Sequence, residues 1–226
     1  MNITLGLLTH RAIDFDRVEL LEASVRSIER ALPTARLYGL DNGSSDGTWD
    51  VLKDVTSHRW ALLGAPSTEP SPPGRGRNRL VEYMGLAGDL LVLSDDDMIW
   101  HEGAEDKLTR FFAAAPDDVA LVSGFVEPDF AHATPRAAVE YGGVRGVVRD
   151  NAPGCCWAFR PAFWREFGPQ PETPIGEDTE VCGRVLTAGR RMVTIRLAEH
   201  LGLGRSSLGN CAGRVAPAFD AARWGV

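Results

Sequence analysis

Hydrophobic runs and amphipathic stretches alternate along the first half of this chain. Short apolar runs bounded by polar residues predict strands buried on both faces, and apolar residues spaced three and four apart predict helices with one buried face. The stretch from Val18 to Leu32 shows this helical spacing, and Pro33 ends the helix. The strands predicted in this half span residues 3–8, 35–40, 60–63, 90–93 and 119–125, and the helices span residues 18–32, 48–53, 77–86 and 104–114.

The second half has a less regular pattern. Residues 127–153 mix polar and apolar positions around several glycines, and the Gly, Ala and Ser content of residues 201–226 predicts no regular structure there. The predicted elements are a strand at 155–159, a helix at 161–167, a helix that opens at 176–178 and reaches 188, and a strand at 192–195. Because strands and helices alternate, we expect a single α/β domain with parallel strand pairing and right-handed crossovers.

The charge balance excludes one large class of function. The chain of 226 residues has a net charge of −7 and a pI of about 5.3, and it contains no run of Lys or Arg. Sequence-independent electrostatic binding of nucleic acid or anionic lipid is therefore not expected. Residues 1–8 lack the features of a signal peptide and no transmembrane segment is predicted, so we expect a cytoplasmic protein. The cysteines show no metal-ligand spacing and are expected to be reduced; they are Cys155, Cys156, Cys182 and Cys211.

Three consecutive carboxylates follow the apolar run at residues 90–93. Asp95, Asp96 and Asp97 would lie at the carboxyl end of a buried strand, which is where open α/β sheets bind ligands. Two carboxylates about 4 Å apart repel by roughly 4 kcal/mol at an effective dielectric of about 20, so a cation or a bound proton is expected between them. An oxygen-only cluster favours a hard ion such as Mg²⁺ or Mn²⁺. For the triplet in isolation, a solvated acidic turn is the alternative.

Four further polar positions can carry chemistry, and each also has an ordinary structural interpretation. The turn at residues 41–48 could hold a nucleobase or ribose, or could only cap the next helix. Arg77, after the Pro-rich loop 66–76, could bind a phosphate or be a solvated surface residue. Asp178, at a predicted helix N-terminus, could accept a proton from a hydroxyl or only complement the helix dipole. His200 could supply an imidazole to a metal or be an ordinary surface or core residue.

In chain order, these stretches resemble the GT-A glycosyltransferases of family 2, inverting enzymes that use nucleotide-diphosphate sugars. The resemblance covers residues 3–200. Each motif is weak alone, and the resemblance depends on their ordered conjunction. The motifs are Thr9-His10-Arg11, residues 40–48, Gly76-Arg77-Asn78, Asp95-Asp96-Asp97, residues 154–160, Gly176-Glu177-Asp178 and His200.

The resemblance implies a GT-A, Rossmann-like α/β fold whose mostly parallel central sheet is flanked by helices. It also implies a single domain over residues 1–226. Within this domain, residues 1–125 would bind the nucleotide sugar, residues 126–200 would bind the acceptor and carry catalysis, and residues 201–226 would form a C-terminal tail.

The resemblance further implies a role for each matching side chain. Asp178 would be the catalytic base, and Glu177 and Trp157 would contact the acceptor. The implied metal ligands are Asp97, Asp95 and His200, with Asp97 as the most direct one. The implied contacts to the donor are Thr9, Arg11, Asp41, Asn42, Arg77, Asp95 and Asp96.

Two positions depart from the family pattern. Asn42 occupies a place where many relatives carry a second Asp, which leaves the base preference open. Residues 169–174 replace the family's usual Phe-Asp turn after Gly168, so acceptor recognition cannot be copied across.

The expected activity is metal-dependent transfer of a sugar, with inversion, from a nucleotide-diphosphate sugar to an acceptor hydroxyl. The expected cofactor is Mn²⁺ or Mg²⁺, the expected donor is a UDP-sugar, and the expected acceptor is soluble or peripherally presented. The acceptor's identity and the oligomeric state stay open. One alternative is a nucleotide-sugar-binding protein without transfer activity, which the retention of every expected acid disfavours. The other is a nucleotidyltransferase, although no glycine-rich phosphate motif lies near the first strand.

Overall fold

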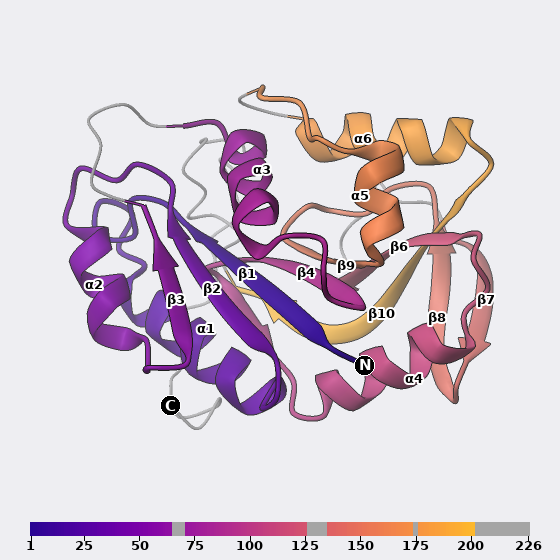
Figure 1. The fold of residues 1–226 in the computed structure, drawn as a ribbon, viewed down its shortest axis with the longest axis horizontal. Coiled ribbons are helices and arrows are strands. Elements are labelled where there is room, and N and C mark those ends of the chain that lie inside the picture. Colours follow the sequence, from indigo (N-terminus) through magenta and orange to yellow (C-terminus); the bar gives the residue numbers. More distant parts are fainter. Residues whose placement is uncertain (65–70, 126–134, 174–175, 202–226) are drawn as a thin grey trace.

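The structure, a computed structural model, describes residues 1–64, 71–125, 135–173 and 176–201 (Figure 1). Its strands are β1 (Ile3–Thr9), β2 (Arg36–Asp41), β3 (Trp60–Leu63), β4 (Leu90–Asp95), β5 (Met98–Trp100), β6 (Val119–Phe125), β7 (Pro135–Tyr141), β8 (Val144–Arg149), β9 (Cys156–Phe159) and β10 (Arg191–His200). Its helices are α1 (Val18–Ala31), α2 (Thr48–Val55), α3 (Pro73–Met84), α4 (Ala104–Ala114), α5 (Pro161–Phe167) and α6 (Glu177–Thr187).

The strands form one sheet in the order β3-β2-β1-β4-β9-β6-β10-β8-β7, with β5 paired to β10. Strands β3, β2, β1 and β4 are parallel, as the alternation of strands and helices predicts, and β6 pairs with β10 in parallel. Strand β9 runs antiparallel between β4 and β6, and both β8 and β5 are antiparallel to β10. The predicted fold class, a central sheet flanked by helices, is confirmed. The sheet is mixed and not mostly parallel, because β9 inserts antiparallel between β4 and β6 and the second half adds antiparallel pairings of β5, β7 and β8.

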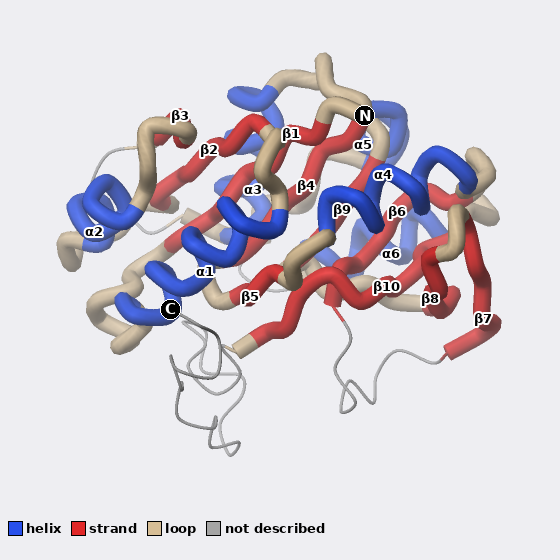
Figure 2. The backbone as a smooth tube through the Cα atoms, turned by 90° about the horizontal axis from the view of Figure 1, so that it is seen from below, coloured by secondary structure: helices blue, strands red, loops and turns tan. Residues whose placement is uncertain are grey.

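Helices cover both faces of the sheet. Helices α3, α5 and α6 lie on one face and α1, α2 and α4 on the other (Figure 1), and Figure 2 shows α1 and α4 in front of the sheet. Alternate residues of β4 pack into the hydrophobic cores on the two faces of the sheet. Leu90 and Val92 pack on the α1 side, and Leu91 and Leu93 pack on the α3 side. Burial on both faces explains why the sequence of this strand is a continuous apolar run.

Three strands were not predicted from the sequence. Strands β7 and β8 form a hairpin inside residues 127–153, joined by Gly142 and Gly143, whose φ angles are +57° and +74°. A glycine pair between two strands is typical of a two-residue hairpin turn, so a signal was available. Strand β5 is only 3 residues long, too short to show a period, and forms because β10 continues to His200 and offers it a partner.

Helix α3 starts earlier than predicted. Pro73 lies in its first turn, where the missing N–H of proline removes no hydrogen bond, so the end of the predicted 66–76 loop is helical. A Cβ on Gly76 would lie 2.7 Å from Asn42 Oδ1. Close packing of α3 on the sheet therefore requires this glycine, which in the sequence alone favours a loop. Residues 66–70 lie outside the described residues.

Within the described part of the chain, no helix is both long and apolar enough to cross a membrane. The described cysteines are free thiols; they are Cys155, Cys156 and Cys182. All but the first residue of the predicted 201–226 tail lies outside the described residues.

Candidate active site

The parallel strands place polar side chains at one edge of the sheet, where their carboxyl ends meet. In the strand register, Thr9 of β1 pairs with Asp41 of β2, and Leu8 of β1 pairs with Asp95 of β4. Thr9 and Asp41 are buried, and the side chain of Asp95 keeps 27% of its surface exposed. Donor-side candidates and the acidic turn therefore share the edge at which α/β sheets bind ligands.

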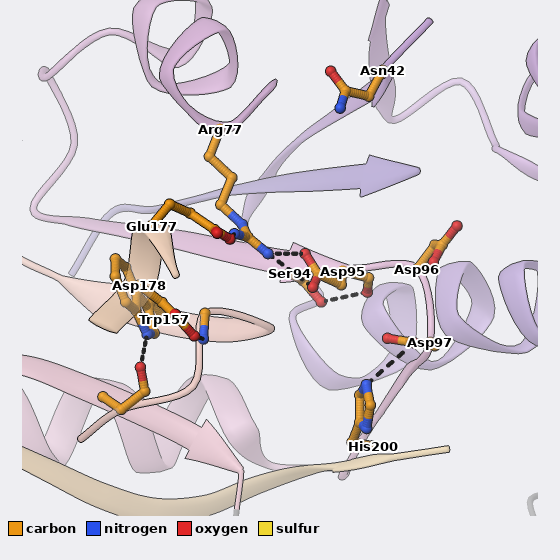
Figure 3. A network of polar contacts seen from close by, with 12 residues as sticks. Asn42, Arg77, Ser94, Asp95, Asp96, Asp97, Trp157, Glu177, Asp178 and His200 are labelled. Atoms are coloured by element: carbon orange, nitrogen blue, oxygen red, sulfur yellow. Dashed lines mark hydrogen bonds and ion pairs between the residues drawn. The ribbon is translucent and has the colours of Figure 1, made fainter. Parts of the chain in front are cut away.

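Two acids of the turn at residues 95–97 pair with basic side chains from distant parts of the chain (Figure 3). Both carboxylate oxygens of Asp95 accept hydrogen bonds from Arg77 Nη2, at 2.8 and 2.9 Å. Asp97 Oδ2 lies 3.2 Å from Nε2 of His200, which ends β10. The structure therefore brings together Asp95, Asp97, Arg77 and His200, which the sequence motifs had singled out one by one.

The middle acid pairs with an arginine that no sequence motif marks. Asp96 Oδ1 accepts a hydrogen bond from Arg17 Nη1 at 2.9 Å, and Asp96 Oδ2 accepts one from the Thr9 hydroxyl at 2.5 Å. Arg17 also donates from Nη2 to the backbone carbonyl of His10 at 2.7 Å, and only 8% of its side chain is exposed. The sequence indicates such a partner only indirectly. Three adjacent acids need cationic partners, and Arg17 lies between β1, the neighbour of β4 in the sheet, and helix α1.

Burial shapes the protonation of the acidic turn. It raises the pKa of Asp96 to about 6, because the paired guanidinium offsets only part of the lost hydration and Asp97 adds repulsion. Burial also raises the pKa of Asp95, although its paired guanidinium opposes the shift. Burial alone would raise the pKa of Asp97 too, but His200 and Arg17 together lower it below its usual value. Asp97 is therefore the acid of this turn whose ionised form is the most favoured.

Glu177 and Asp178 open helix α6 beside the acidic turn (Figure 3). Arg77 joins the two places, because its Nη1 donates to Glu177 Oε1 at 2.7 Å while its Nη2 binds Asp95. Asp178 is half-buried, and its Oδ2 accepts a hydrogen bond from the backbone N–H of Gly154 at 3.0 Å. Its Oδ1 accepts one from the N–H of the following residue at 2.7 Å. The Thr179 hydroxyl also donates to Oδ1, at 3.4 Å, whereas Oδ2 keeps a second lone pair with which the oriented carboxylate can still accept a proton.

The turn after β2 presents two buried acceptors that have no hydrogen-bond partner among the described residues, Asp41 Oδ2 and Asn42 Oδ1. Asp41 Oδ1 accepts hydrogen bonds from the N–H and hydroxyl of Ser44, at 3.1 and 2.5 Å. Asp41 Oδ2 is buried and has no hydrogen-bond partner among the described residues, and burial raises the pKa of this carboxyl. The neighbouring Asn42 donates from Nδ2 to the carbonyl of Ser71 at 2.8 Å, so its amide is used to fasten the segment before α3. Asp41 Oδ2 can therefore accept a hydrogen bond from an N–H or O–H group of a ligand.

Two of the expected site residues have side chains that are engaged with other parts of the fold. The guanidinium of Arg11 pairs with Asp14 on the surface, and only its backbone N–H reaches into the turn, donating to Ser44 Oγ at 2.8 Å. Trp157 is fully buried in β9, and its indole N–H donates to the carbonyl of Ala152 at 2.9 Å. The Trp157 ring has no exposed surface to offer an acceptor, and its position instead supports the neighbouring turn.

The acidic turn offers some of the ligands that a divalent cation needs. Asp97 Oδ1 is buried and has no hydrogen-bond partner in the described part of the chain, and the His200 imidazole lies beside the other oxygen. Both oxygens of Asp95 are engaged by Arg77. Among the described residues, no group of three or more His, Cys, Asp or Glu side chains is placed to hold a metal by itself. Cations such as Mg²⁺ are often held by one or two carboxylates together with substrate phosphates, and Asp97 fits that arrangement.

Solved structures resemble this fold. One is the mannosyltransferase PcManGT from Pyrobaculum calidifontis in complex with GDP-Man and Mn²⁺, with a TM-score of 0.64 and 18% identity, over 88% of this chain and 56% of that one. Another is S. aureus TarS in complex with UDP-GlcNAc, with a TM-score of 0.62 and 12% identity, over 88% of this chain and 58% of that one. The chain thus spans less than two thirds of the length of either structure, and at these identities the likeness shows the fold alone.

A search of curated proteins finds no match to this chain. The family model described as "Glycosyl transferase family 2" matches residues 15–167, which is more than half of the chain. The resemblance seen in the ordered motifs is thereby confirmed, and the chain belongs to glycosyl transferase family 2.

Proposed function

We propose that this protein transfers a sugar, with inversion, from a nucleotide-diphosphate sugar to an acceptor hydroxyl. One observation carries the proposal: the guanidinium of Arg77 binds Asp95 and Glu177 at once and so ties the acidic turn to the start of helix α6, which carries Asp178. Family membership supports glycosyl transfer, and the nucleotide sugars bound by PcManGT and TarS support a donor of that class.

Asp178 is the proposed general base. Its carboxylate would take the proton of the acceptor hydroxyl while the acceptor oxygen forms a bond to the anomeric carbon of the donor. The bond between that carbon and the diphosphate oxygen breaks in the same displacement, its electron pair leaves with the diphosphate, and the configuration inverts. The N–H groups of Gly154 and Thr179 hold the carboxylate in a single orientation for this step.

The acidic turn is the proposed cation site. Asp97, with Asp95 and His200 beside it, would hold Mn²⁺ or Mg²⁺, and such an ion when bound offsets the charge on the leaving diphosphate. The unused oxygen of Asp97 supports this assignment. Asp96 is committed to Arg17 and to a hydroxyl, so its proposed role is to steady the turn.

Donor binding is assigned to residues 1–125 and acceptor binding to residues 126–200. Thr9 and Asp41 are the proposed nucleoside contacts, because they end adjacent strands and Asp41 keeps an unused acceptor. A UDP-sugar is the proposed donor, and GDP is a necessary comparison because PcManGT was solved with GDP-Man. A cytoplasmic location stays a prediction from the sequence.

Product analysis tests the proposed function. The protein, incubated with a panel of nucleotide sugars, MnCl₂ and simple hydroxyl acceptors, should release a nucleoside diphosphate together with a glycosylated product. Release of a sugar 1-phosphate together with a nucleotidylated acceptor would indicate nucleotidyl transfer, and release of neither product across the panel would indicate a binding protein. Either result would overturn the proposal.

Asp178→Asn should lower turnover at least about 100-fold while binding of the nucleoside diphosphate survives, because the amide keeps the shape of the carboxylate but cannot take the proton. Steady-state rates of diphosphate release and calorimetric titration measure the two effects. Glu180→Gln is the matched control, since Glu180 lies in the same helical turn with an exposed side chain paired to Arg184. Near wild-type turnover of Asp178→Asn would remove this residue from the base role.

A further inference from the structure

Arg77 lies where three segments of the chain meet. Its Nη2 donates to both oxygens of Asp95 at 2.8 and 2.9 Å, and its Nη1 donates to Glu177 Oε1 at 2.7 Å. Only 6% of its side chain is exposed. A Cβ placed on Gly154 would lie 3.1 Å from Nη1, so the turn before β9 closes over the guanidinium from the third side.

These contacts engage both Nη groups of the guanidinium with protein carboxylates, while its Nε is buried and has no hydrogen-bond partner among the described residues. An arginine that binds a diphosphate usually donates hydrogen bonds from both of its Nη groups to the phosphate oxygens. In Arg77 both Nη groups point at Asp95 and Glu177 (Figure 3). Its charge offsets the cost of burying two acids near one another, and the acids in turn raise the pKa of the guanidinium although burial alone would lower it.

Helix α3, which carries Arg77, is fastened to the second half of the chain. Asn78 exchanges two hydrogen bonds with the backbone of Gln170, at 2.8 and 2.9 Å. A Cβ on Gly74 would lie 2.1 Å from the carbonyl oxygen of Pro171, so the two backbones are in close contact. The segment after α5 thus holds the helix in place, and Arg77 extends from a fixed support.

We infer that Arg77 is a positioning residue: by holding Asp95 and Glu177 together it sets the separation between the acidic turn and Asp178, and it does not bind the donor itself. This inference rests on the proposed function. Loss of the paired contacts would let the start of α6 shift relative to the acidic turn. A displacement of about 1 Å can slow a reaction about 100-fold, whereas donor binding would stay largely intact.

Arg77→Lys is the first variant, because a single ammonium keeps the charge but cannot span two carboxylates as the guanidinium fork does. We expect kcat to fall about 100-fold, while the Kd for UDP or GDP in the presence of MnCl₂ changes less than about threefold. Glu177→Gln should likewise lower kcat while the Kd for UDP or GDP changes less than about threefold. The double variant should lose no more kcat than Arg77→Lys alone, because both changes break one contact. Arg30→Gln removes an exposed charge at the far end of α1 and should leave both quantities unchanged.

The outcomes separate the alternatives. A Kd that weakens as much as kcat would mean that Arg77 contacts the donor, and multiplicative losses in the double variant would mean independent roles; both overturn the inference. If circular dichroism shows that Arg77→Lys does not fold, Glu177→Gln decides, and an unchanged kcat there overturns the inference. A wild-type protein that transfers no sugar overturns the proposed function itself, whereas an active wild type with an unaffected Arg77→Lys overturns only the role of Arg77.

Discussion

At the scale of single residues, the acidic turn is matched in charge by basic side chains of the same chain. Arg77 pairs with Asp95, Arg17 pairs with Asp96, and the imidazole of His200 lies beside Asp97. Removing one partner of a buried pair is costly because it leaves a buried charge uncompensated. The acidic turn is therefore held by paired charges and is not a solvated loop. Each residue of it can be substituted separately.

Asp97→Ala should abolish the part of nucleotide binding that depends on the cation, because it removes the unused carboxylate oxygen. We expect MnCl₂ to tighten binding of UDP or GDP to the wild type by at least about tenfold, and to have no such effect on the variant. Calorimetric titration with and without MnCl₂ measures this difference. Asp106→Ala, at an exposed position of α4, is the control. If Asp97→Ala keeps the full manganese effect, Asp97 is not a metal ligand.

Asp41→Asn should change how stability depends on pH. Burial raises the pKa of Asp41 above 3.8, so just above pH 3.8 the folded protein keeps a proton that the unfolded chain has released. The free energy of unfolding of the wild type, relative to the variant, therefore falls as pH rises through this window, by at most about 1.4 kcal/mol per pH unit, and is flat above it. Urea denaturation of both proteins between about pH 4 and about pH 7 measures the trend. A relative stability that instead increases with pH would contradict the burial of this carboxyl.

At the scale of elements, helix α3 shows how close packing and chemistry depend on each other. Its approach to β1 and β2 is possible because Gly76 has no side chain: a Cβ there would lie 2.7 Å from Asn42 Oδ1 and 2.7 Å from Leu8 Cδ1. The residue that follows Gly76 is Arg77. The glycine that weakens the helix in isolation therefore allows the arginine to reach the acidic turn.

Gly76→Ala should destabilise the protein by about 1–3 kcal/mol, because the added methyl group overpacks the contact between helix and sheet. Gly183→Ala is the matched control, since Gly183 lies inside helix α6 and a Cβ there would meet no described atom within 4 Å. The control should gain about 0.5–1 kcal/mol from the better helix propensity of alanine. Urea denaturation measures both values, and equal effects of the two changes would contradict the packing seen at α3.

At the scale of the whole molecule, one sheet with helices on both faces holds the proposed donor and acceptor sides together. The first four strands in the sheet order are parallel and bring their carboxyl ends to one edge. Helix α6 and strand β10, from the second half, then add Asp178 and His200 near that edge. A ligand bound at that edge would contact segments from both halves of the chain, so it should stabilise the whole fold.

Nucleoside diphosphate and cation together should raise the melting temperature more than either alone. At a free nucleotide concentration of about 100 times Kd, binding to the folded state contributes about 2.7 kcal/mol, which for a chain of this size corresponds to about 5–10 °C. Thermal unfolding with UDP or GDP, with and without MnCl₂, measures the shift. No shift with either nucleotide in the presence of MnCl₂ would contradict a nucleotide site.

Local sequence patterns were sufficient for most elements. The predicted α4, β6, α5 and β3 match the structure residue for residue, because apolar spacing and flanking prolines or glycines act over a few neighbours. The resemblance also implied Asp95, Asp97 and His200 as metal ligands; the structure places His200 beside Asp97, and the assignment of the three as ligands stays a prediction. The assignment of residues 1–125 and 126–200 to donor and acceptor stays a prediction.

Pairing between distant residues could not be predicted in this way. Arg77 and Glu177 are 100 positions apart, and Arg17 and Asp96 are 79 positions apart, so no local pattern could show which charges meet. The same holds for the burial of Trp157 and the antiparallel insertion of β9. Alternation of polar and apolar residues encodes the strands, the helices and the acidic turn, because those depend on neighbours along the chain. The partners of each buried charge depend on which elements pack together, and packing is a property of the folded chain in three dimensions.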